Sequence, residues 1–482
     1  VGALLIMLLV SQSTSVYQTV FFFFLAVMSA AFSLISSIAL AVSFDSESVA
    51  FQFVEKRGWM PSIGLEYHLA VDGMSVLFIC LTSLLSLICI LASLFTIKKQ
   101  LKEYLVCFLL LESLIIGFFC SMNLLLLYFF FEMMLVPMFL IIGIWGGENR
   151  IYAALKFFLY TFLGSVLFLA ALVMIYHFTG PFNIELLATS LQAVDPTFAR
   201  FMLVGIFIAF AVKVPMWPVH TWLPDAHVEA PTGGSIMLAG ILLKVGGYGL
   251  LRVSLPLFPE ASILFAPWVV YLSIIAIIYG SLVAMNQTDM KKMIAYSSVA
   301  HMGYITAGIF SLSSTAIEGA IFQMISHGVI SSGLFLSVGI LYERMHTKVI
   351  ASYGGAARVM PVFATFLMIY VLGAVTLPGT SGFIGEFFIL IGLFEHYPYS
   401  TALASTGVIL GAIYMLKLYR DVMLGSITNK AISRLKDVTK REMTVMLPLV
   451  LLVIWLGLFP NVVLSFLDFP LSYIDSILGA VK

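Results

Sequence analysis

The chain has 482 residues, and its 24 basic and 24 acidic residues give a formal net charge of zero. Apolar residues make up 61% of the chain and charged residues only 10%, whereas soluble domains carry about 45–50% and about 25%. No soluble fold has enough interior to bury this much apolar surface. The composition therefore indicates an integral membrane protein, and it excludes an aqueous enzyme, a nucleic-acid binder and a disordered scaffold.

Long apolar runs follow one another along the whole chain, and a helix that crosses a bilayer needs about 20 such residues. The runs lie at 1–10, 19–43, 74–97, 103–121, 122–145, 152–177, 200–219, 233–254, 262–285, 292–311, 316–342, 361–394, 400–424 and 443–467. They predict an all-α, polytopic membrane protein with about fourteen transmembrane helices in a single domain, 1–482. Because the run at 1–10 is short and the chain begins at Val1 without methionine, we expect an incomplete or processed start.

Lysine and arginine residues are distributed unevenly when the loops are assigned alternately to the two sides of the membrane. Fifteen of the 24, Lys291 among them, fall on one side, and five, including Arg252, fall on the other. The remaining four lie within helices or at their ends. The side with fifteen is expected to face the cytoplasm or the mitochondrial matrix, and both termini the opposite side.

Two of the apolar segments are interrupted by proline. The seventh reads AVKVPMWPVHTWLP, and the twelfth is interrupted at 377–380 by the sequence LPGT. Proline removes a backbone hydrogen bond and breaks a helix. In a bilayer the freed carbonyl groups must be satisfied by protein or water, and broken helices of this kind line ion or substrate paths in transporters.

The two broken helices occupy corresponding places in the chain. Segments four to eight, residues 103–254, and segments nine to thirteen, residues 262–424, each contain five helices with the broken helix fourth. Lys213 lies beside the first break and Glu386 beside the second. Because five is an odd number of crossings, we predict two inverted repeats, followed at 425–482 by a last loop and a C-terminal transmembrane helix.

Five lysine and glutamate side chains well inside the apolar segments are the informative charges. A charge at the centre of a membrane helix costs at least about 2.5–3.5 kcal/mol, so such residues usually serve a function. The alternative is a structural ion pair that fixes helix packing. For Glu112 that alternative stays open, because neither a helix break nor a partner is adjacent. The other four are Glu132, Lys213, Lys244 and Glu386.

A glutamate and a lysine in apolar surroundings can act as a proton switch. Burial lowers the pKa of a lysine from about 10.4, and a nearby carboxylate raises it again. We therefore expect Lys213 to hold its proton when Glu132 is close and to release it when Glu132 withdraws. Desolvation favours the protonated form of a carboxyl group, which makes Glu386 the expected acceptor.

Histidines extend this set. His301 and His327 lie within apolar helices beside serine and threonine residues, which favours a proton relay over a purely packed role. His220 and His227, with Asp225 and Glu229, fit no metal-binding spacing. A structured turn is favoured there, and His220 is kept as a minor candidate for proton transfer.

Motifs for redox cofactors are missing from the sequence. There is no P-loop, no GxGxxG after a strand, no GxSxG and no haem-binding CxxCH. The four cysteines, at 80, 89, 107 and 120, lie in apolar runs without a CxxC pair and are interpreted as small core residues. We expect no nucleotide, flavin, iron–sulfur or metal site on this chain.

Four stretches carry a resemblance to a known family. FFFEMMLVPMFLIIGIWGG, AVKVPMWPVHTWLPDAHVEAPTGGSIMLAGILLKVGGYG, DMKKMIAYSSVAHMGY and LPGTSGFIGEF resemble the antiporter-like subunit 4, or bacterial chain M, of proton-pumping NADH:quinone oxidoreductase, respiratory complex I. The resemblance runs from about residue 45 to about residue 465. GIWGG, Arg150 and KFFLYT look like subunit 4 rather than its sister subunits 2 and 5.

The resemblance implies fourteen helices with two inverted repeats. It implies that Lys213 is the central pumping lysine, with Glu132 as its partner, that Lys244 is the connecting lysine, and that Glu386 is the terminal glutamate. His301 and His327 match relay histidines, so that protons would pass from the positive-rich side through Lys244 and both histidines to Lys213. Glu386 would pass them toward the opposite face.

The same resemblance implies partners and a location. Subunits 2 and 5, other membrane-arm subunits and lipid would surround the chain, with no nucleic acid. NADH, FMN, iron–sulfur clusters and ubiquinone would be bound by partner subunits, and no cofactor by this chain. The mitochondrial inner membrane is favoured, and a bacterial plasma membrane is the alternative.

Other functions are compatible with these residues. A cation/proton antiporter or membrane-bound hydrogenase subunit would share the four charged positions. A structural assembly subunit would conduct no protons, and a photosynthetic relative would use ferredoxin and plastoquinone.

Overall fold

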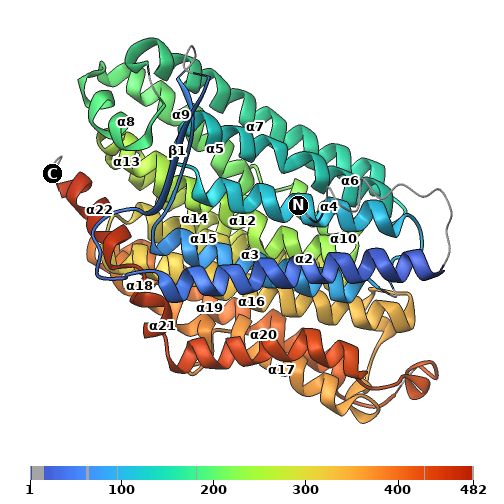
Figure 1. The fold of residues 1–482 in the computed structure, drawn as a ribbon. Coiled ribbons are helices and arrows are strands. Elements are labelled where there is room, and N and C mark those ends of the chain that lie inside the picture. Colours follow the sequence, from blue (N-terminus) through green and yellow to red (C-terminus); the bar gives the residue numbers. More distant parts are fainter. Residues whose placement is uncertain are drawn as a thin grey trace.

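The computed structural model describes residues 2, 16–60, 64–94, 96–180, 182–427 and 429–479. They form a bundle of helices that run roughly side by side along one direction (Figure 1). Within these ranges, eleven helices are long and apolar enough to cross a membrane. The chain is therefore a polytopic, helical membrane protein, as the composition predicts. Apart from Gly2, the run at 1–10 lies outside the described residues, so the first helix and the total of fourteen stay predictions.

Each of the other thirteen predicted segments coincides with one helix or with a run of successive helices. The first group comprises α2 (Val16–Ser43), α3 (Gly73–Ser93), α4 (Leu101–Cys120), α5 (Leu124–Met133), α6 (Leu135–Trp145), α7 (Arg150–Thr179), α9 (Pro196–Lys213), α10 (Trp222–Glu229), α11 (Thr232–Met237), α12 (Leu243–Gly249) and α13 (Leu255–Leu257). The second group comprises α14 (Pro259–Met285), α15 (Met290–Phe310), α16 (Ser314–Met345), α17 (Pro361–Ala374), α18 (Ser381–His396), α19 (Pro398–Met423) and α20 (Lys440–Leu458). Shorter helices α8 (Ile184–Ser190), α21 (Asn461–Leu464) and α22 (Asp468–Gly479) lie in the connections and near the C-terminus.

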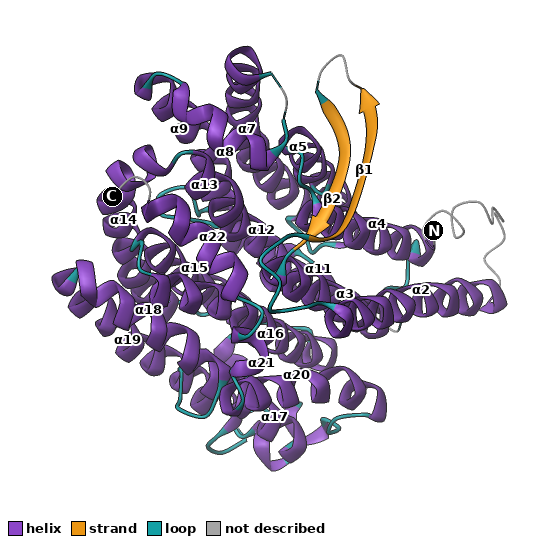
Figure 2. Ribbon diagram, turned by 60° about the vertical axis from the view of Figure 1, so that its left-hand side comes forward, coloured by secondary structure: helices purple, strands orange, loops and turns teal. Residues whose placement is uncertain are grey.

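A β-hairpin between α2 and α3 was not anticipated. Strands β1 (Gln52–Met60) and β2 (Leu65–Val71) pair antiparallel and stand at one end of the bundle (Figure 2). The polar, β-prone stretch QFVEKRGWM lies between the apolar runs 19–43 and 74–97, outside every predicted membrane segment.

The two predicted helix breaks are confirmed. α9 ends at Lys213 and α10 begins at Trp222. α17 ends at Ala374 and α18 begins at Ser381, and the turn between them contains Gly379 with a φ of +91°, a conformation that favours glycine. A further, unpredicted interruption at Met134 separates α5 from α6, two residues after Glu132.

One of the two most deeply buried crossing helices in the described part of the chain, 232–257, is irregular in a way that the sequence did not reveal. Between α11 and α13 it contains two π-helical segments, Leu238–Leu242 and Leu250–Ser254. A π turn shifts the hydrogen-bond register and is frequent at functional sites. At Gly246, an added methyl group would come within 2.8 Å of the Phe210 carbonyl oxygen, so the glycine lets this helix approach α9, which carries Lys213.

Two basic residues that the topology count assigned to loops lie inside the protein. Arg252 is only 4% exposed; it forms an ion pair with the fully buried Asp72 and donates a hydrogen bond from Nε to Tyr248 Oη (3.1 Å). Lys291, also 4% exposed, lies in the first turn of α15. The assignment of both to aqueous loops was wrong, because each lies at a helix end that other helices cover.

The Arg252–Asp72 pair gives a prediction for stability. Breaking a buried ion pair leaves an uncompensated charge and costs about 3–5 kcal/mol. We therefore expect R252M to lower the thermal midpoint and the abundance of the assembled protein in membranes. The double variant D72N/R252M should recover most of the loss, since Asn still accepts the cap bond that Asp72 Oδ1 receives from Ser75 N. A double variant as unstable as R252M would contradict this explanation.

Candidate functional site

Lys244, on α12, is completely buried and hydrogen-bonded. Its Nζ donates to the carbonyl oxygen of Ala239, in the π-helical segment, and lies 2.8 Å from His327 Nδ1 on α16. The other ring nitrogen of His327 lies 3.1 Å from Ser298 Oγ on α15. When Lys244 carries its proton it can only donate, so Nδ1 of His327 accepts and Nε2 donates to Ser298. Three helices thus contribute to one hydrogen-bonded chain.

A second hydrogen-bonded group surrounds Glu386 on α18. His301 Nδ1, from α15, lies 2.6 Å from Glu386 Oε1, and Gln323 Nε2, from α16, donates to the same oxygen at 3.0 Å. Glu386 is 3% exposed, and its charge is thus compensated by donors from two neighbouring helices. Both groups place their ionisable side chains next to a break or a π turn.

A small cavity separates these two groups. The ring centroids of His301 and His327 are 5.6 Å apart, and both side chains line the cavity together with Ser298, Gln323 and Ser331. His301 Nε2, Gln323 Oε1 and Ser331 Oγ are buried without a hydrogen-bond partner. The space open to a water-sized sphere is about 10 Å³, close to the minimum that holds one water molecule. One water would therefore satisfy these atoms, and it would join the two groups through Ser298 Oγ, which lines the same cavity.

Lys213 is much less well compensated. Its Nζ is buried without a hydrogen-bond partner, and the ammonium lies over the rings of Phe131 (5.1 Å) and Phe157 (5.7 Å). Glu132 is close enough for its charge to act on Lys213. Within the described chain, however, the two form no ion pair of 4 Å or less, and Glu132 accepts a hydrogen bond from Tyr128 Oη (3.2 Å).

The contacts of the two histidines differ from the expected arrangement. Sequence analysis placed both histidines between Lys244 and Lys213. Instead, His327 contacts Lys244 and His301 contacts Glu386, so the histidines connect Lys244 with Glu386. Spacing along the chain contains no information about which of two neighbouring lysines a histidine faces.

His220 and Glu112, the two minor candidates for proton transfer, lie apart from the hydrogen-bonded groups around Lys244 and Glu386. His220 is buried in the interval between α9 and α10, where its ring lies edge-on to Tyr279 at 5.3 Å. Glu112, 3% exposed on α4, accepts a hydrogen bond from Ser86 Oγ (2.8 Å) on α3. The segment that contains His227 is the helix α10 rather than the expected turn, since WLPDAHVE places proline only at its third position.

Several polar residues that complete the site were missed. Ser298 precedes His301 by three residues, and Gln323 and Ser331 flank His327 at a spacing of four. Residues three or four apart share one face of a helix. A polar stripe at this spacing within an apolar helix is therefore the signal that identifies them.

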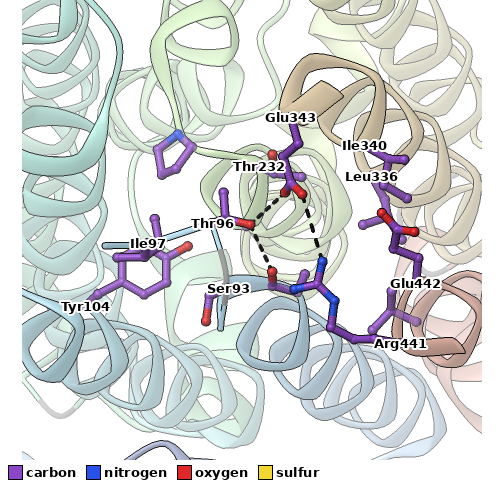
Figure 3. A pocket seen from close by; sticks show the side chains of 14 residues that line it. Ser93, Thr96, Ile97, Tyr104, Thr232, Leu336, Ile340, Glu343, Arg441 and Glu442 are labelled. Carbon is purple, nitrogen blue, oxygen red and sulfur yellow. Dashed lines mark hydrogen bonds and ion pairs between the residues drawn. The ribbon is translucent and has the colours of Figure 1, made fainter. Parts of the chain in front are cut away.

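A cavity elsewhere in the bundle is not connected to these groups. It lies among α3, α11, α16 and α20 (Figure 3). There Thr96 Oγ1 donates to Glu343 Oε1 (2.6 Å), and Arg441 lies 3.9 Å from the same carboxylate. Its charged side chains come from helix ends and are all in ion pairs, Glu343 with Arg441 and Glu442 with Arg344 outside the cavity, which is typical of a structural contact.

The structure bears on metal binding in the part of the chain that it describes. Within those ranges, no group of three or more His, Cys, Asp or Glu side chains is arranged to hold a metal ion. All four cysteines are free and at least partly buried. The buried ionisable residues are instead arranged along a line of proton donors and acceptors.

Comparison with known proteins gives the family. Residues 121–459 match the family described as NADH:quinone oxidoreductase/Mrp antiporter, TM. The chain belongs to this family. It is 59% identical over 466 residues to NADH-quinone oxidoreductase subunit M of Rickettsia felis, covering 96% of this chain and 94% of the relative. It is 47% identical to NADH-ubiquinone oxidoreductase chain 4 of Marchantia polymorpha, with 88% and 86% covered.

Solved structures agree with this placement in the NADH:quinone oxidoreductase/Mrp antiporter family. A chain of respiratory complex I from Thermus thermophilus with bound NADH superposes with a TM-score of 0.86 at 31% identity, with 95% of each chain covered. A chain of the Mrp complex from Dietzia sp. has a TM-score of 0.87 at 20% identity, which shows a shared fold. The resemblance found in the sequence motifs is thereby confirmed.

The cavity between the histidines provides a direct structural prediction. A density map of the assembled complex that resolves ordered water should show one molecule bonded to His301 Nε2, Ser331 Oγ and Gln323 Oε1 and within hydrogen-bond distance of Ser298 Oγ. Three partners are typical of a buried water. Rotated side chains that bond to one another and fill the cavity would contradict this prediction.

Proposed function

We propose that this chain is a proton-translocating membrane-arm subunit of an NADH:quinone oxidoreductase, respiratory complex I. The observation that carries the proposal is the buried chain from Lys244 through His327 and Ser298 to His301 and Glu386. Membership of the family and 59% identity to a subunit M support the choice of complex. A buried chain of this kind has no structural requirement for titratable groups, since apolar residues would pack there at lower cost.

Proton transfer proceeds along the existing hydrogen bonds. Lys244 gives a proton to His327 Nδ1 while His327 releases its Nε2 proton to Ser298, and Ser298 passes its own hydroxyl proton to the cavity water, so that Lys244 alone has lost a proton at this stage. The proton passes over the cavity water to His301 Nε2, and His301 then transfers its Nδ1 proton to Glu386. The hydrogen-bond lengths of 2.6–3.1 Å along this route lie within the range in which protons transfer directly.

Lys213 and Glu132 set the direction of proton transfer. In this structure the Lys213 cation is stabilised by two aromatic faces, worth about 2 kcal/mol when desolvated, and by the attraction of Glu132 across more than ion-pair distance. Approach of Glu132 would stabilise the cation, and its withdrawal would favour release of the proton. This pair is thus the part of the site that a charge change in a neighbouring subunit can control.

The driving reaction takes place elsewhere in the complex. NADH oxidation and quinone reduction would occur in partner subunits that bind NADH, FMN, iron–sulfur clusters and ubiquinone, and this chain would hold no redox cofactor. Its neighbours would be the antiporter-like subunits 2 and 5. Energy would reach this subunit as a rearrangement of charge along the membrane arm.

Two five-helix units, 103–254 and 262–424, would surround the route as inverted repeats. Each unit contributes one broken helix, with Lys213 at the first break and Glu386 near the second. The location would be an energy-transducing membrane, and both bacterial and organellar types of relative match the chain.

A cation/proton antiporter subunit is the second candidate, because the Mrp complex shares the fold. The 59% identity to a subunit M against 20% to the Mrp chain favours complex I. Co-purification with an NADH-oxidising arm supports the first function, and its absence supports the second.

Removal of the central lysine tests the function. We expect K213A to reduce proton pumping and coupled NADH:quinone turnover by about tenfold or more, because it removes the buried charge through which Glu132 controls proton transfer, while the complex remains assembled. Pumping is measured in proteoliposomes. The control K417A removes an exposed lysine of α19 and should pump normally. Normal pumping by K213A, with only a lower abundance, would indicate a structural assembly subunit.

Three further substitutions compare how much the other buried ionisable residues contribute to proton pumping. E132A should lower pumping as K213A does, because it removes the charge that controls Lys213. K244A should also lower pumping, because it removes the first residue of the route from Lys244 to Glu386. E112A should have a milder effect, since Glu112 contacts none of these residues. An E112A variant as impaired as K244A, assembled to the same extent, would contradict the route.

A further inference from the structure

Tyr128 contacts Glu132 from one turn earlier on α5. The two residues are four positions apart, a spacing that places side chains on one face of a helix. The Tyr128 hydroxyl donates to Glu132 Oε1 (3.2 Å). Among the residues that the structure describes, Tyr128 is the one side chain that forms a hydrogen bond with this carboxylate. The position of the Glu132 carboxylate relative to Lys213 therefore depends on the Tyr128 hydroxyl.

The ring of Tyr128 belongs to the same aromatic cluster that contacts Lys213. It packs edge-on against Phe168 of α7 (5.3 Å between ring centroids), and Phe168 in turn contacts Phe131 (6.0 Å). The Lys213 ammonium lies over the ring of Phe131. Because Phe168 and Phe131 are fully buried, close packing holds these rings in place. The hydroxyl proton of Tyr128 can still rotate toward a different acceptor.

Ser165 of α7 supplies that second acceptor. It is completely buried and close enough to hydrogen-bond to the Tyr128 hydroxyl. The Oγ proton of Ser165 is already donated to the carbonyl oxygen of Phe162 (2.9 Å), so the lone pairs of Oγ are free to accept. The Tyr128 hydroxyl therefore has a partner whether Glu132 is bound to it or has moved away, and neither position strands a buried donor.

The carboxylate of Glu132 is bound by Tyr128 rather than by Lys213. Lys213 Nζ has no hydrogen-bond partner, although the charge of Glu132 acts on it. Glu132 belongs to the last turn of α5, which ends at Met133, and a helix end is less constrained than its centre. A carboxylate binds an ammonium more strongly than a neutral hydroxyl. The bond to Tyr128 is thus the contact that opposes formation of the ion pair.

We propose that Tyr128 is a positioning residue that holds Glu132 away from Lys213 while Lys213 releases its proton. This inference rests on the proposed function and adds one residue to it. When the hydroxyl turns to Ser165, the carboxylate is free to approach Lys213 and to stabilise its protonated form. Tyr128 keeps its own proton in both positions, so the transferred proton does not pass through it.

A purely structural role for the Tyr128 hydroxyl is the competing explanation. Y128F removes the hydroxyl and retains the ring that packs on Phe168. Tyr160, also on α7, provides a matched control, because it is half-buried like Tyr128 and its hydroxyl is hydrogen-bonded to the neutral side chain of Thr221 (2.8 Å). Y160F therefore removes a similar hydrogen bond that involves no carboxylate.

The test uses the whole complex in proteoliposomes, with pumping, coupled turnover and abundance as readouts. We expect Y128F to slow coupled turnover by about tenfold at normal abundance, because the loss of one hydrogen bond to a charged group changes the balance between two positions by about that factor. Y160F should behave as the wild type.

A double variant separates positioning from structure. Glutamine at position 132 brings no charge to Lys213, so E132Q leaves no ion pair for the Tyr128 hydroxyl to oppose. Measured against the residual turnover of E132Q, the further loss in Y128F/E132Q should be less than about twofold, since the two substitutions act on one interaction. A structural loss would instead multiply in this background.

A density map of the Y128F complex gives the most direct readout. A carboxylate oxygen of Glu132 should lie within about 4 Å of Lys213 Nζ, the distance of an ion pair. Four results would overturn the proposal: normal turnover in Y128F, equal losses in Y128F and Y160F, a full further loss in Y128F/E132Q, and a Glu132 that stays apart from Lys213 in the map.

K213A is run in parallel with these variants. If K213A is impaired while Y128F is normal, only the positioning role of Tyr128 is wrong. A normal K213A overturns the proposed function itself.

Discussion

A charged side chain in the hydrocarbon part of a bilayer costs at least about 2.5–3.5 kcal/mol, and the whole structure is arranged around this cost. Lys213, Lys244 and Glu386 are 1%, 0% and 3% exposed, so protein rather than lipid surrounds each of them. Lys244 and Glu386 are compensated by hydrogen bonds. Lys213 lacks such bonds, which makes it the group whose protonation state responds most easily to a nearby charge.

Irregular helices supply free backbone carbonyl groups, which regular helices use in their own hydrogen bonds. An α-helix uses its own carbonyl groups, whereas a break or a π turn leaves some of them free to accept other bonds. Ala239, in a π-helical segment, accepts from Lys244, and Ala230, just after α10, accepts from Lys291. The same local irregularities that disturb the helices therefore position the titratable groups at the centre of a rigid bundle.

Much of this fold was predictable, because a membrane helix must be long, apolar and internally hydrogen-bonded. Proline at 215 and 378 identified the two breaks, and the cost of buried charge identified Lys213 and Glu386. The π turns were not predictable, since GILLKVGGYG reads as an ordinary helix. The partners of His301 and His327 were not predictable either, because they depend on how neighbouring helices are rotated against one another.

The central claim is that the line from Lys244 to Glu386 conducts protons, and interruption at its middle tests this most directly. The measurement is the number of protons pumped per electron by complexes with H327F, which replaces the ring by one of similar size that cannot bind a proton. A ratio well below the wild-type value in fully assembled complexes is the predicted result. An unchanged ratio would show that protons cross by another route.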